Sequence, residues 1–237
     1  YALQRWMLKH QRRKVTINGK WPKQPEHCLT FENPCLTLKE REDGQQITKG
    51  KNYAPPFIFC FVGRLEDAKG VQRIIDAFGA LDNLESIKTI HFIGDGEKMT
   101  HYKKQCKALD LPVVFHGFLE RQEVFGIYKE SHFILLPSDS EGFPKVIAEG
   151  MNFGCIPIVS DVSSIGQYVS DDNGFLLNPI SELRLREVLQ EAFSKKTEEL
   201  IKMASDCYLV ASNFTFGLYR KRILEEIINS HSNDKIN

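Results

Sequence analysis

Short apolar runs alternate with amphipathic segments through the middle of the chain. The first run, residues 57–62, holds six apolar residues without a polar interruption, which is typical of a buried parallel strand. The segment after it carries Val71, Ile74, Ile75 and Phe78 at helical spacing. Strand and helix alternate six times, so the pattern predicts an α/β fold with a doubly wound parallel sheet. The expected strands are 57–62, 89–93, 113–115, 133–137, 156–160 and 175–177. The expected helices lie near 71–78, 97–109 and 121–130, from Pro144, after Ser181 and near 216–229.

The first 56 residues carry a weaker pattern. Residues 1–14 predict a short amphipathic helix, and its basic end fits a solvated helix terminus better than a phosphate- or lipid-binding patch. Residues 15–19 predict a strand with an Asn-Gly turn. Residues 20–52 are polar and proline-rich, and two short apolar alternations flank Asp43-Gly44, which predicts a hairpin there. No catalytic or binding chemistry is readable in this segment.

Composition narrows the class of protein. The 237 residues are 42% hydrophobic and 26% charged, as in ordinary globular proteins, and the formal net charge is zero. A neutral chain offers no global field to recruit nucleic acid or anionic membrane, and no apolar run approaches the roughly 18–20 residues that span a bilayer. The chain begins at Tyr1 without a signal-peptide pattern, so we expect a segment of a longer protein.

Six cysteines are spread along the chain, and none forms a Cys-x2-Cys pair. This spacing argues against a disulfide framework and against a structural zinc site, and it favours the reducing cytoplasm. The cysteines are Cys28, Cys35, Cys60, Cys106, Cys155 and Cys207.

Two carboxylates stand eight positions apart across a strand-to-helix turn. Glu141 lies in a turn with Gly142, Pro144 suits the first helical position, and Glu149 falls about a turn and a half into the helix. Both acids therefore approach the carboxyl end of a strand, where open α/β sheets bind ligands. Acids placed in this way can accept hydrogen bonds from the hydroxyls of two sugars.

A second candidate follows the strand at 57–62. Arg64 and Lys69 flank a loop that begins at Gly63 and leads into a helix, an arrangement suited to clamping a diphosphate. The same loop also fits a surface turn in which the two cations pair with Glu66 and Asp67. From these residues alone both readings stay open.

Two further strand ends carry glycines. Gly94-Asp95-Gly96 allows close backbone approach, but Met99 stands where a dinucleotide fingerprint requires glycine, which disfavours a Rossmann oxidoreductase. That turn fits a ligand loop and an ordinary connection equally well. Gly117-Phe118 offers backbone groups and an aromatic face to a base, while the preceding His116 is better read as a strand-end histidine than as a catalyst.

In this order, these motifs resemble the nucleotide-sugar-binding domain of the GT-B glycosyltransferases of family 4. The resemblance runs from about residue 57 to 179, roughly half of the chain, and is most specific over 140–151 and 154–161. The family reads E-G-F, E-A-M seven residues on, and then G-x-P-V-I. Gly150 replaces the usual alanine, and Ser163-Ser164 stands where two glycines are commoner, which puts the donor preference in doubt.

The resemblance implies a role for each site residue. Arg64 and Lys69 would hold the donor diphosphate, Glu141 the transferred sugar and Glu149 the ribose. The resemblance marks Arg64, Lys69 and Glu141 as catalytic. It also implies that the nucleotide base meets the Gly117-Phe118 loop and that the sugar and phosphates meet the backbone of the E-G-F turn. The implied donor-binding residues are Gly63, Arg64, Lys69, Gly94, Gly117, Phe118, Glu141, Gly142, Phe143, Pro144 and Glu149.

By the same resemblance the fold is Rossmann-like, with a terminal crossover helix. Residues 1–56 would be the tail of an N-terminal domain with a linker, 57–212 the donor-binding domain, and 213–237 a helix that packs toward the missing domain. The chain alone should bind donor weakly and transfer nothing. No cofactor or metal is expected, because the family usually needs none and no Asp-x-Asp is present.

The implied activity is that of a retaining hexosyltransferase. The intact enzyme would move a sugar from a nucleotide diphosphate to a glycan or lipid-linked acceptor in polysaccharide biosynthesis, in the cytoplasm or at the inner face of a membrane. No nucleic-acid partner is expected. Two alternatives stay open: another enzyme on this fold, such as a sugar-nucleotide epimerase or a phosphorylase, and a non-catalytic partner subunit that keeps the nucleotide-sugar site.

Overall fold

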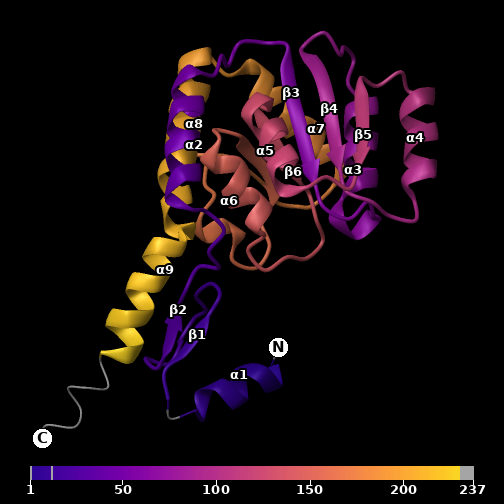
Figure 1. The fold of residues 1–237 in the computed structure, drawn as a ribbon. Coiled ribbons are helices and arrows are strands. Elements are labelled where there is room, and N and C mark those ends of the chain that lie inside the picture. Colours follow the sequence, from indigo (N-terminus) through magenta and orange to yellow (C-terminus); the bar gives the residue numbers. More distant parts are fainter. Residues whose placement is uncertain (1, 12, 230–237) are drawn as a thin grey trace, which may run out of the picture.

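A six-stranded parallel sheet forms the centre of the molecule. The computed structural model describes residues 2–11 and 13–229. Its strand order is β5-β4-β3-β6-β7-β8, which is the doubly wound order 3-2-1-4-5-6 when counting starts at β3, and it confirms the predicted fold class (Figure 1). The strands are β3 (Phe57–Val62), β4 (Ile87–Ile93), β5 (Val113–Gly117), β6 (Phe133–Leu136), β7 (Ile156–Ser160) and β8 (Phe175–Leu177).

Helices cover both faces of this sheet (Figure 1). On one face α3 packs against α4 and α7, and on the other α6 packs against α5 and α8. The helix at 197–211 was not predicted, although its buried Leu200, Met203, Ala204 and Cys207 have helical spacing. The helices are α3 (Val71–Gly79), α4 (Met99–Ala108), α5 (Arg121–Glu130), α6 (Lys145–Asn152), α7 (Glu182–Ser194) and α8 (Thr197–Ala211).

The hairpin predicted at Asp43-Gly44 is wrong, because a helix runs through it. Helix α2 (Leu38–Gly50) starts at a capping box in which Thr37 and Glu40 each accept a hydrogen bond from the other's backbone N–H. Gly44 lies mid-helix, and a side chain there would overlap the backbone oxygen of Asn152 on α6. The glycine therefore serves the packing of α2 on α6 and does not form a turn.

Replacing Gly44 with alanine tests this explanation. Alanine is the better helix former by about 1 kcal/mol, but its methyl group would overlap α6, and overpacking of this kind costs about 1–3 kcal/mol. We expect Gly44→Ala to lower the free energy of unfolding, as measured by urea denaturation. Gly50→Ala on the same helix is the matched control, because no atom lies within 4 Å of the added methyl group. Equal stability of the two variants would contradict the explanation.

The two ends of the chain form a smaller unit beside the sheet (Figure 1). Strands β1 (Val15–Ile17) and β2 (Cys28–Thr30) pair in parallel, and the predicted N-terminal helix is present as α1 (Ala2–Lys9). The predicted last helix is present as α9 (Phe216–Arg222), which continues as a π-helix over Ile223–Ile228. Residues 230–237 lie outside the described residues, so the predicted limit of the last segment is not tested there.

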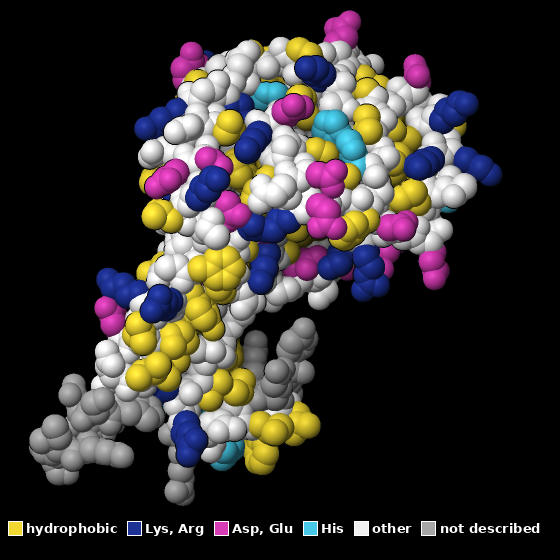
Figure 2. Space-filling model, in the orientation of Figure 1, with side chains coloured by type: hydrophobic (Ala, Val, Ile, Leu, Met, Phe, Trp, Pro, Cys, Tyr) yellow, Lys and Arg dark blue, Asp and Glu magenta, His cyan; other side chains and the backbone are white. Residues whose placement is uncertain are grey.

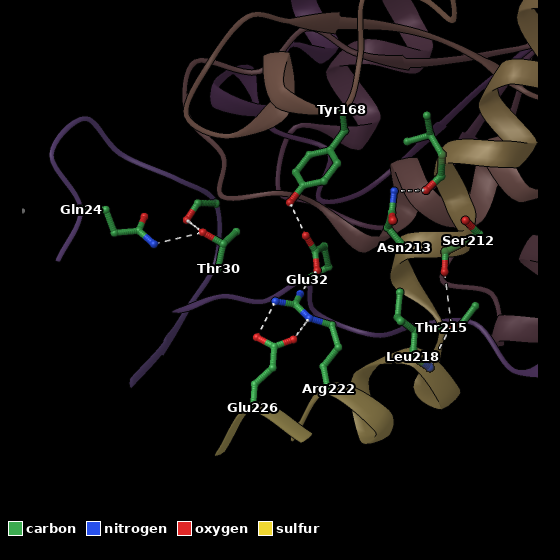
Figure 3. Close-up of polar contacts among 12 residues, drawn as sticks. Gln24, Thr30, Glu32, Tyr168, Ser212, Asn213, Thr215, Leu218, Arg222 and Glu226 are labelled. Carbon is green, nitrogen blue, oxygen red and sulfur yellow. Dashed lines mark hydrogen bonds and ion pairs between the residues drawn. The ribbon is translucent and has the colours of Figure 1, made fainter. Parts of the chain in front are cut away.

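A chain of polar contacts joins these ends to the main domain (Figure 3). The Tyr168 hydroxyl donates to Glu32, 3.1 Å away, and Arg222 donates to the same carboxylate at 2.9 Å. Arg222 also pairs with Glu226 one turn along and lies over the ring of Phe31. The segment after β2, the last helix and the loop after β7 therefore hold one another in place.

Charged side chains of both signs are interspersed over the face shown in Figure 2, whereas hydrophobic side chains gather over α9. Phe216, Leu224 and Ile228 are among the exposed apolar side chains there. The prediction that this helix packs toward a further domain stays a prediction. In the described part of the chain, no helix is both long enough and apolar enough to cross a bilayer. All six cysteines are buried and unpaired.

His132 is buried beside the start of β6 in a fixed tautomer. Its Nδ1 accepts a hydrogen bond from the backbone of Ile58 at 2.9 Å, and its Nε2 donates to the Asn52 carbonyl at 2.7 Å. Burial lowers the pKa of His132 from 6.5 to about 4. Protonation of Nδ1 would remove the lone pair that accepts the hydrogen bond from the backbone N–H of Ile58.

The stability of the protein should therefore fall in mild acid. Because the folded-state pKa of His132 lies below its unfolded value, this stabilisation is complete above about pH 6.5 and is lost as the pH falls toward 4. The slope contributed by this group approaches about 1.4 kcal/mol per pH unit. Urea denaturation between pH 7.5 and 4.5 should show that the free energy of unfolding depends less steeply on pH in His132→Asn than in the wild type. The exposed His101→Gln is the control and should keep the full slope; a wild-type slope in His132→Asn would contradict the assignment.

Candidate functional site

The candidate residues meet at the carboxyl ends of β3, β4, β5 and β6. A hollow of about 430 Å³ lies between the first three strand ends, and Gly63, Arg64, Gly94 and Phe118 are among its lining residues. Gly94 has a φ of +129°, and a side chain there would overlap the carbonyl of Gly63. Its N–H donates to the carbonyl of Gly117 at 2.8 Å. The glycines therefore allow the three loops to touch, and the structure brings these predicted residues together.

The two predicted phosphate-binding cations behave differently. The side chain of Arg64 is 77% exposed on the rim of the hollow and lies 3.7 Å from Glu66, as in the surface-turn reading. The surface-turn reading also required Lys69 to pair with Asp67. Instead, the Nζ of Lys69 lies 2.6 Å from Oε1 of Glu141. Gly70 follows with a φ of +85°, where a side chain would overlap the carbonyl of Pro137. The ion pair and this close backbone approach therefore join the loop after β3 to the loop after β6.

The Lys69–Glu141 pair is largely withdrawn from solvent. The two side chains are only 28% and 10% exposed. A backbone hydrogen bond of 2.9 Å from Asp139 to Ala68 joins the same two loops. A pair shielded in this way keeps more of its electrostatic attraction than a surface pair does. Among the predicted residues, this ion pair is the one direct contact between a cation and an acid in the described part of the chain.

The rest of the E-G-F turn serves packing and backbone geometry. The ring of Phe143 is buried and stacks on Phe214 with 4.5 Å between centroids, while Tyr168 lies edge-on to it. Gly142 is exposed. Pro144 caps α6, which begins one residue later than predicted, and it has no N–H to offer a ligand. Phe143 thus anchors the turn, leaving only its backbone and that of Gly142 for contact.

Glu149 lies on α6 and meets a residue that the sequence did not mark. Its side chain is 12% exposed, and its Oε1 accepts a hydrogen bond of 3.3 Å from Nε of Arg121 at the start of α5. Burial raises the pKa of Glu149, and the nearby Arg121 only partly offsets that effect. Arg121 also donates to the Glu40 carboxylate on α2 and to the carbonyl of Cys35.

Arg121 and Glu40 are therefore site-adjacent residues that the sequence analysis missed. Glu40 belongs to the segment in which no chemistry was readable, and the one signal it offered was the capping spacing from Thr37. Burial raises the pKa of Glu40, but its hydrogen bonds with Arg121 and Thr37 outweigh burial and leave the pKa below its usual value. Arg121 stands 28 positions from Glu149 in no motif, so nothing in the sequence pairs the two residues.

The other flagged residues have structural explanations. Nε2 of His116 lies 2.9 Å from Nδ1 of His91 on the neighbouring strand, and burial lowers the pKa of both, which agrees with a strand-end histidine. Ser163 adopts a φ of +54° and, with Ser164, lines a hollow of about 110 Å³ against the turn that follows β1. Among residues 2–11 and 13–229, no group of three or more His, Cys, Asp or Glu gathers as metal ligands would.

Solved structures with the same fold are glycosyltransferases. The apo form of the lipopolysaccharide outer core galactosyltransferase WaaB superposes with a TM-score of 0.67 at 23% identity, over 86% of this chain and 56% of that one. HepE from Anabaena, in complex with UDP-glucose, superposes with a TM-score of 0.62 at 22% identity, over 82% and 54% of the two chains. The fold therefore matches the Rossmann-like domains of GT-B glycosyltransferases.

The sequence carries the identification further. Residues 43–210 match the family of glycosyl transferases group 1, a span of well over half of the chain. The chain belongs to this family, which confirms the resemblance to glycosyltransferases.

Curated relatives are longer than this chain. An uncharacterized glycosyltransferase of Haemophilus influenzae is 33% identical over 127 residues, which are 52% of this chain and 36% of that protein. The sulfoquinovosyl transferase SQD2 of Arabidopsis thaliana is 28% identical over 182 residues, 68% of this chain and 34% of that protein. The lipopolysaccharide 1,6-galactosyltransferase of Salmonella typhimurium is 33% identical over 114 residues, 46% and 31% of the two. The chain thus spans about a third of the length of these relatives.

Proposed function

We propose that this chain is the donor-binding domain of a retaining glycosyltransferase that transfers a sugar from a nucleotide diphosphate. The observation that carries the proposal is the Lys69–Glu141 pair, in which a cation and an acid lie 2.6 Å apart at the same edge of the sheet as the glycine-containing hollow. Both groups lie where the strand order reverses, and open α/β sheets bind their ligands at that point. HepE, which shares the fold, holds UDP-glucose in its solved complex, which supports this class of donor.

In this proposal the cations bind the diphosphate. Lys69 supplies a shielded ammonium and Arg64 an exposed guanidinium on the rim of the hollow, which can fold onto phosphate oxygens. When the bond between the sugar and the diphosphate breaks, negative charge grows on the leaving phosphate oxygen. Two cations that contact the phosphate in the bound state would stabilise this charge, so they would act in catalysis as well as in binding. No metal or organic cofactor is part of the proposal.

The acids and the turn bind the sugars. Glu141 would accept hydrogen bonds from hydroxyls of the transferred sugar, and Glu149 from those of the ribose. The backbone N–H groups of Gly142 and Phe143 would face the sugar and phosphates, whereas Pro144 only fixes the geometry of the turn. The base would enter the hollow beside Gly117 and Phe118, whose ring is exposed there.

The acceptor belongs to the part of the enzyme beyond this domain. The chain spans about a third of the curated relatives, so acceptor binding and transfer would need further sequence. Relatives named for lipopolysaccharide transfer support a glycan or lipid-linked acceptor and a role in polysaccharide biosynthesis. Peripheral contact of the intact enzyme with the cytoplasmic face of a membrane fits such an acceptor. Retention of configuration rests on the resemblance of the motifs alone.

A binding panel tests the donor site. Calorimetry of the chain with UDP, GDP and ADP should reveal one preferred diphosphate. Arg64→Ala and Lys69→Ala should each weaken its binding by about 10- to 100-fold, the value of one charge-assisted hydrogen bond. Arg184→Ala, which removes a surface ion pair on α7, is the control and should bind as the wild type does. Failure of all three diphosphates to bind at millimolar concentration would contradict the proposal.

The Lys69–Glu141 pair makes a second prediction. In the free protein the carboxylate competes with phosphate for the ammonium, so Glu141→Gln should tighten UDP binding several-fold. The same change should bring no such gain for UDP-glucose, because the lost carboxylate would have bound the sugar. The measurement is the ratio of the two affinities in wild type and variant. An unchanged ratio would separate Glu141 from the sugar and remove its proposed role.

A further inference from the structure

We propose that Arg121 is a positioning residue that orients the Glu149 carboxylate and keeps it ionised to accept hydrogen bonds from the ribose hydroxyls of the donor. The inference rests on the proposed function, because it assumes that Glu149 meets the ribose. It assigns a role to a residue that no sequence motif marks, and it explains what keeps the Glu149 carboxyl ionised.

The guanidinium of Arg121 is fixed before any ligand arrives. Its Nε donates to Glu149, and its two terminal nitrogens donate to the carboxylate of Glu40 and the carbonyl of Cys35. Its Cζ lies 4.3 Å from the ring centroid of Phe125 on the same helix. Four partners therefore hold the guanidinium in one orientation, although the side chain is 42% exposed. A donor held in this way orders the Glu149 side chain in advance, so less entropy is lost when a ligand binds.

Glu149 keeps acceptor capacity for a ligand. Within the described residues, Arg121 is the side chain that donates a hydrogen bond to its carboxylate. An ionised carboxylate offers about four acceptor positions, so most of them remain free for a pair of neighbouring hydroxyls. Once protonated, the group becomes in part a donor and loses acceptor positions. The charge state of Glu149 therefore governs how well a ribose can bind.

The charges around Glu149 oppose one another. Arg121 on α5 and Lys145 on α6 favour its ionised form, while burial and Glu40 on α2 favour its protonated form. The neutral Cys35 and Tyr128 lie in the same surroundings, and burial raises the pKa of both. One guanidinium is thus shared between two carboxylates. Its loss would leave the two acids without the cation that they share, which favours the protonated form of one of them.

This balance predicts opposite effects for two substitutions at one cluster. Arg121→Gln should raise the pKa of Glu149, since it removes the shared cation. Glu40→Gln should lower that pKa, since it removes the competing anion and leaves the guanidinium to Glu149. Glutamine at position 40 can still accept the capping hydrogen bond from Thr37, so α2 keeps its start. These opposite pKa shifts follow from the charges of the two partners alone, so the role in ligand binding is decided by whether the affinity for a nucleoside diphosphate follows them.

The experiment combines a direct titration with a binding profile on the full chain. Carbon NMR of the Glu149 carboxyl gives its pKa in wild type, Arg121→Gln, Glu40→Gln and Arg121→Lys. Calorimetry with the tightest-binding diphosphate of UDP, GDP and ADP, from pH 5 to 8, gives the affinity profile. Arg184→Gln on α7 is the control for loss of an arginine ion pair elsewhere.

We expect Arg121→Gln to weaken binding by about tenfold or more at pH 7, and Glu40→Gln to extend tight binding to lower pH. Arg121→Lys keeps the charge without the planar fork, so it should restore the pKa but only part of the affinity. The 2′-deoxy form of the nucleotide should lose less affinity than the ribose form on Arg121→Gln.

Two outcomes separate the inference from the function on which it rests. Diphosphate binding that survives with the same pH profile and the same Glu149 pKa in Arg121→Gln and Glu40→Gln would overturn the role of Arg121 and leave the donor site standing. Absence of binding in the wild type would overturn the donor site. In that case the titration alone would still decide whether Arg121 controls the ionisation of Glu149.

Discussion

The candidate site exists because backbones touch at the carboxyl edge of the sheet. A side chain at Gly94 would overlap the carbonyl of Gly63, and one at Gly70 would overlap the carbonyl of Pro137. These contacts draw the loops after β3, β4 and β6 together at the point where the strand order reverses. The parallel sheet supplies the edge, and the glycines let the loops close over it. The Lys69–Glu141 contact joins two of these loops.

In the free protein, ion pairs hold the charged side chains at this edge of the sheet. Lys69 is held by Glu141, and Arg121 is shared by Glu149 and Glu40, so no acid of these two clusters stands without a cation. A diphosphate would take over the first cation, and a ribose would use the remaining acceptors of Glu149. Binding in this account exchanges partners within a preformed set of groups. Because these groups are partly shielded from solvent, each exchange of partners changes the electrostatic energy more than it would at an exposed surface.

The sequence was sufficient to predict the elements with periodic apolar residues and the turn that carries a recognisable motif. Apolar runs and helical spacing defined the sheet and most of its helices, and the E-G-F turn with its paired acids pointed to the edge of the sheet at which the candidate residues meet. The Asp43-Gly44 hairpin failed because a mid-helix glycine that fits against Asn152 looks, in sequence, like a turn. Phe143 could not be assigned to the core in advance, because its partner Phe214 is distant in sequence. Arg121 was missed for the same reason, since its partners come from three other segments.

A crystal structure of the chain with its preferred nucleoside diphosphate is the most direct test of the central claim. The account predicts that the Lys69–Glu141 contact opens and that Lys69 and Arg64 contact phosphate oxygens. It also predicts ribose hydroxyls at about 3 Å from the Glu149 carboxylate, with Arg121 unmoved. A nucleotide bound away from the carboxyl ends of β3 to β6, or bound with the Lys69–Glu141 pair intact, would contradict the account.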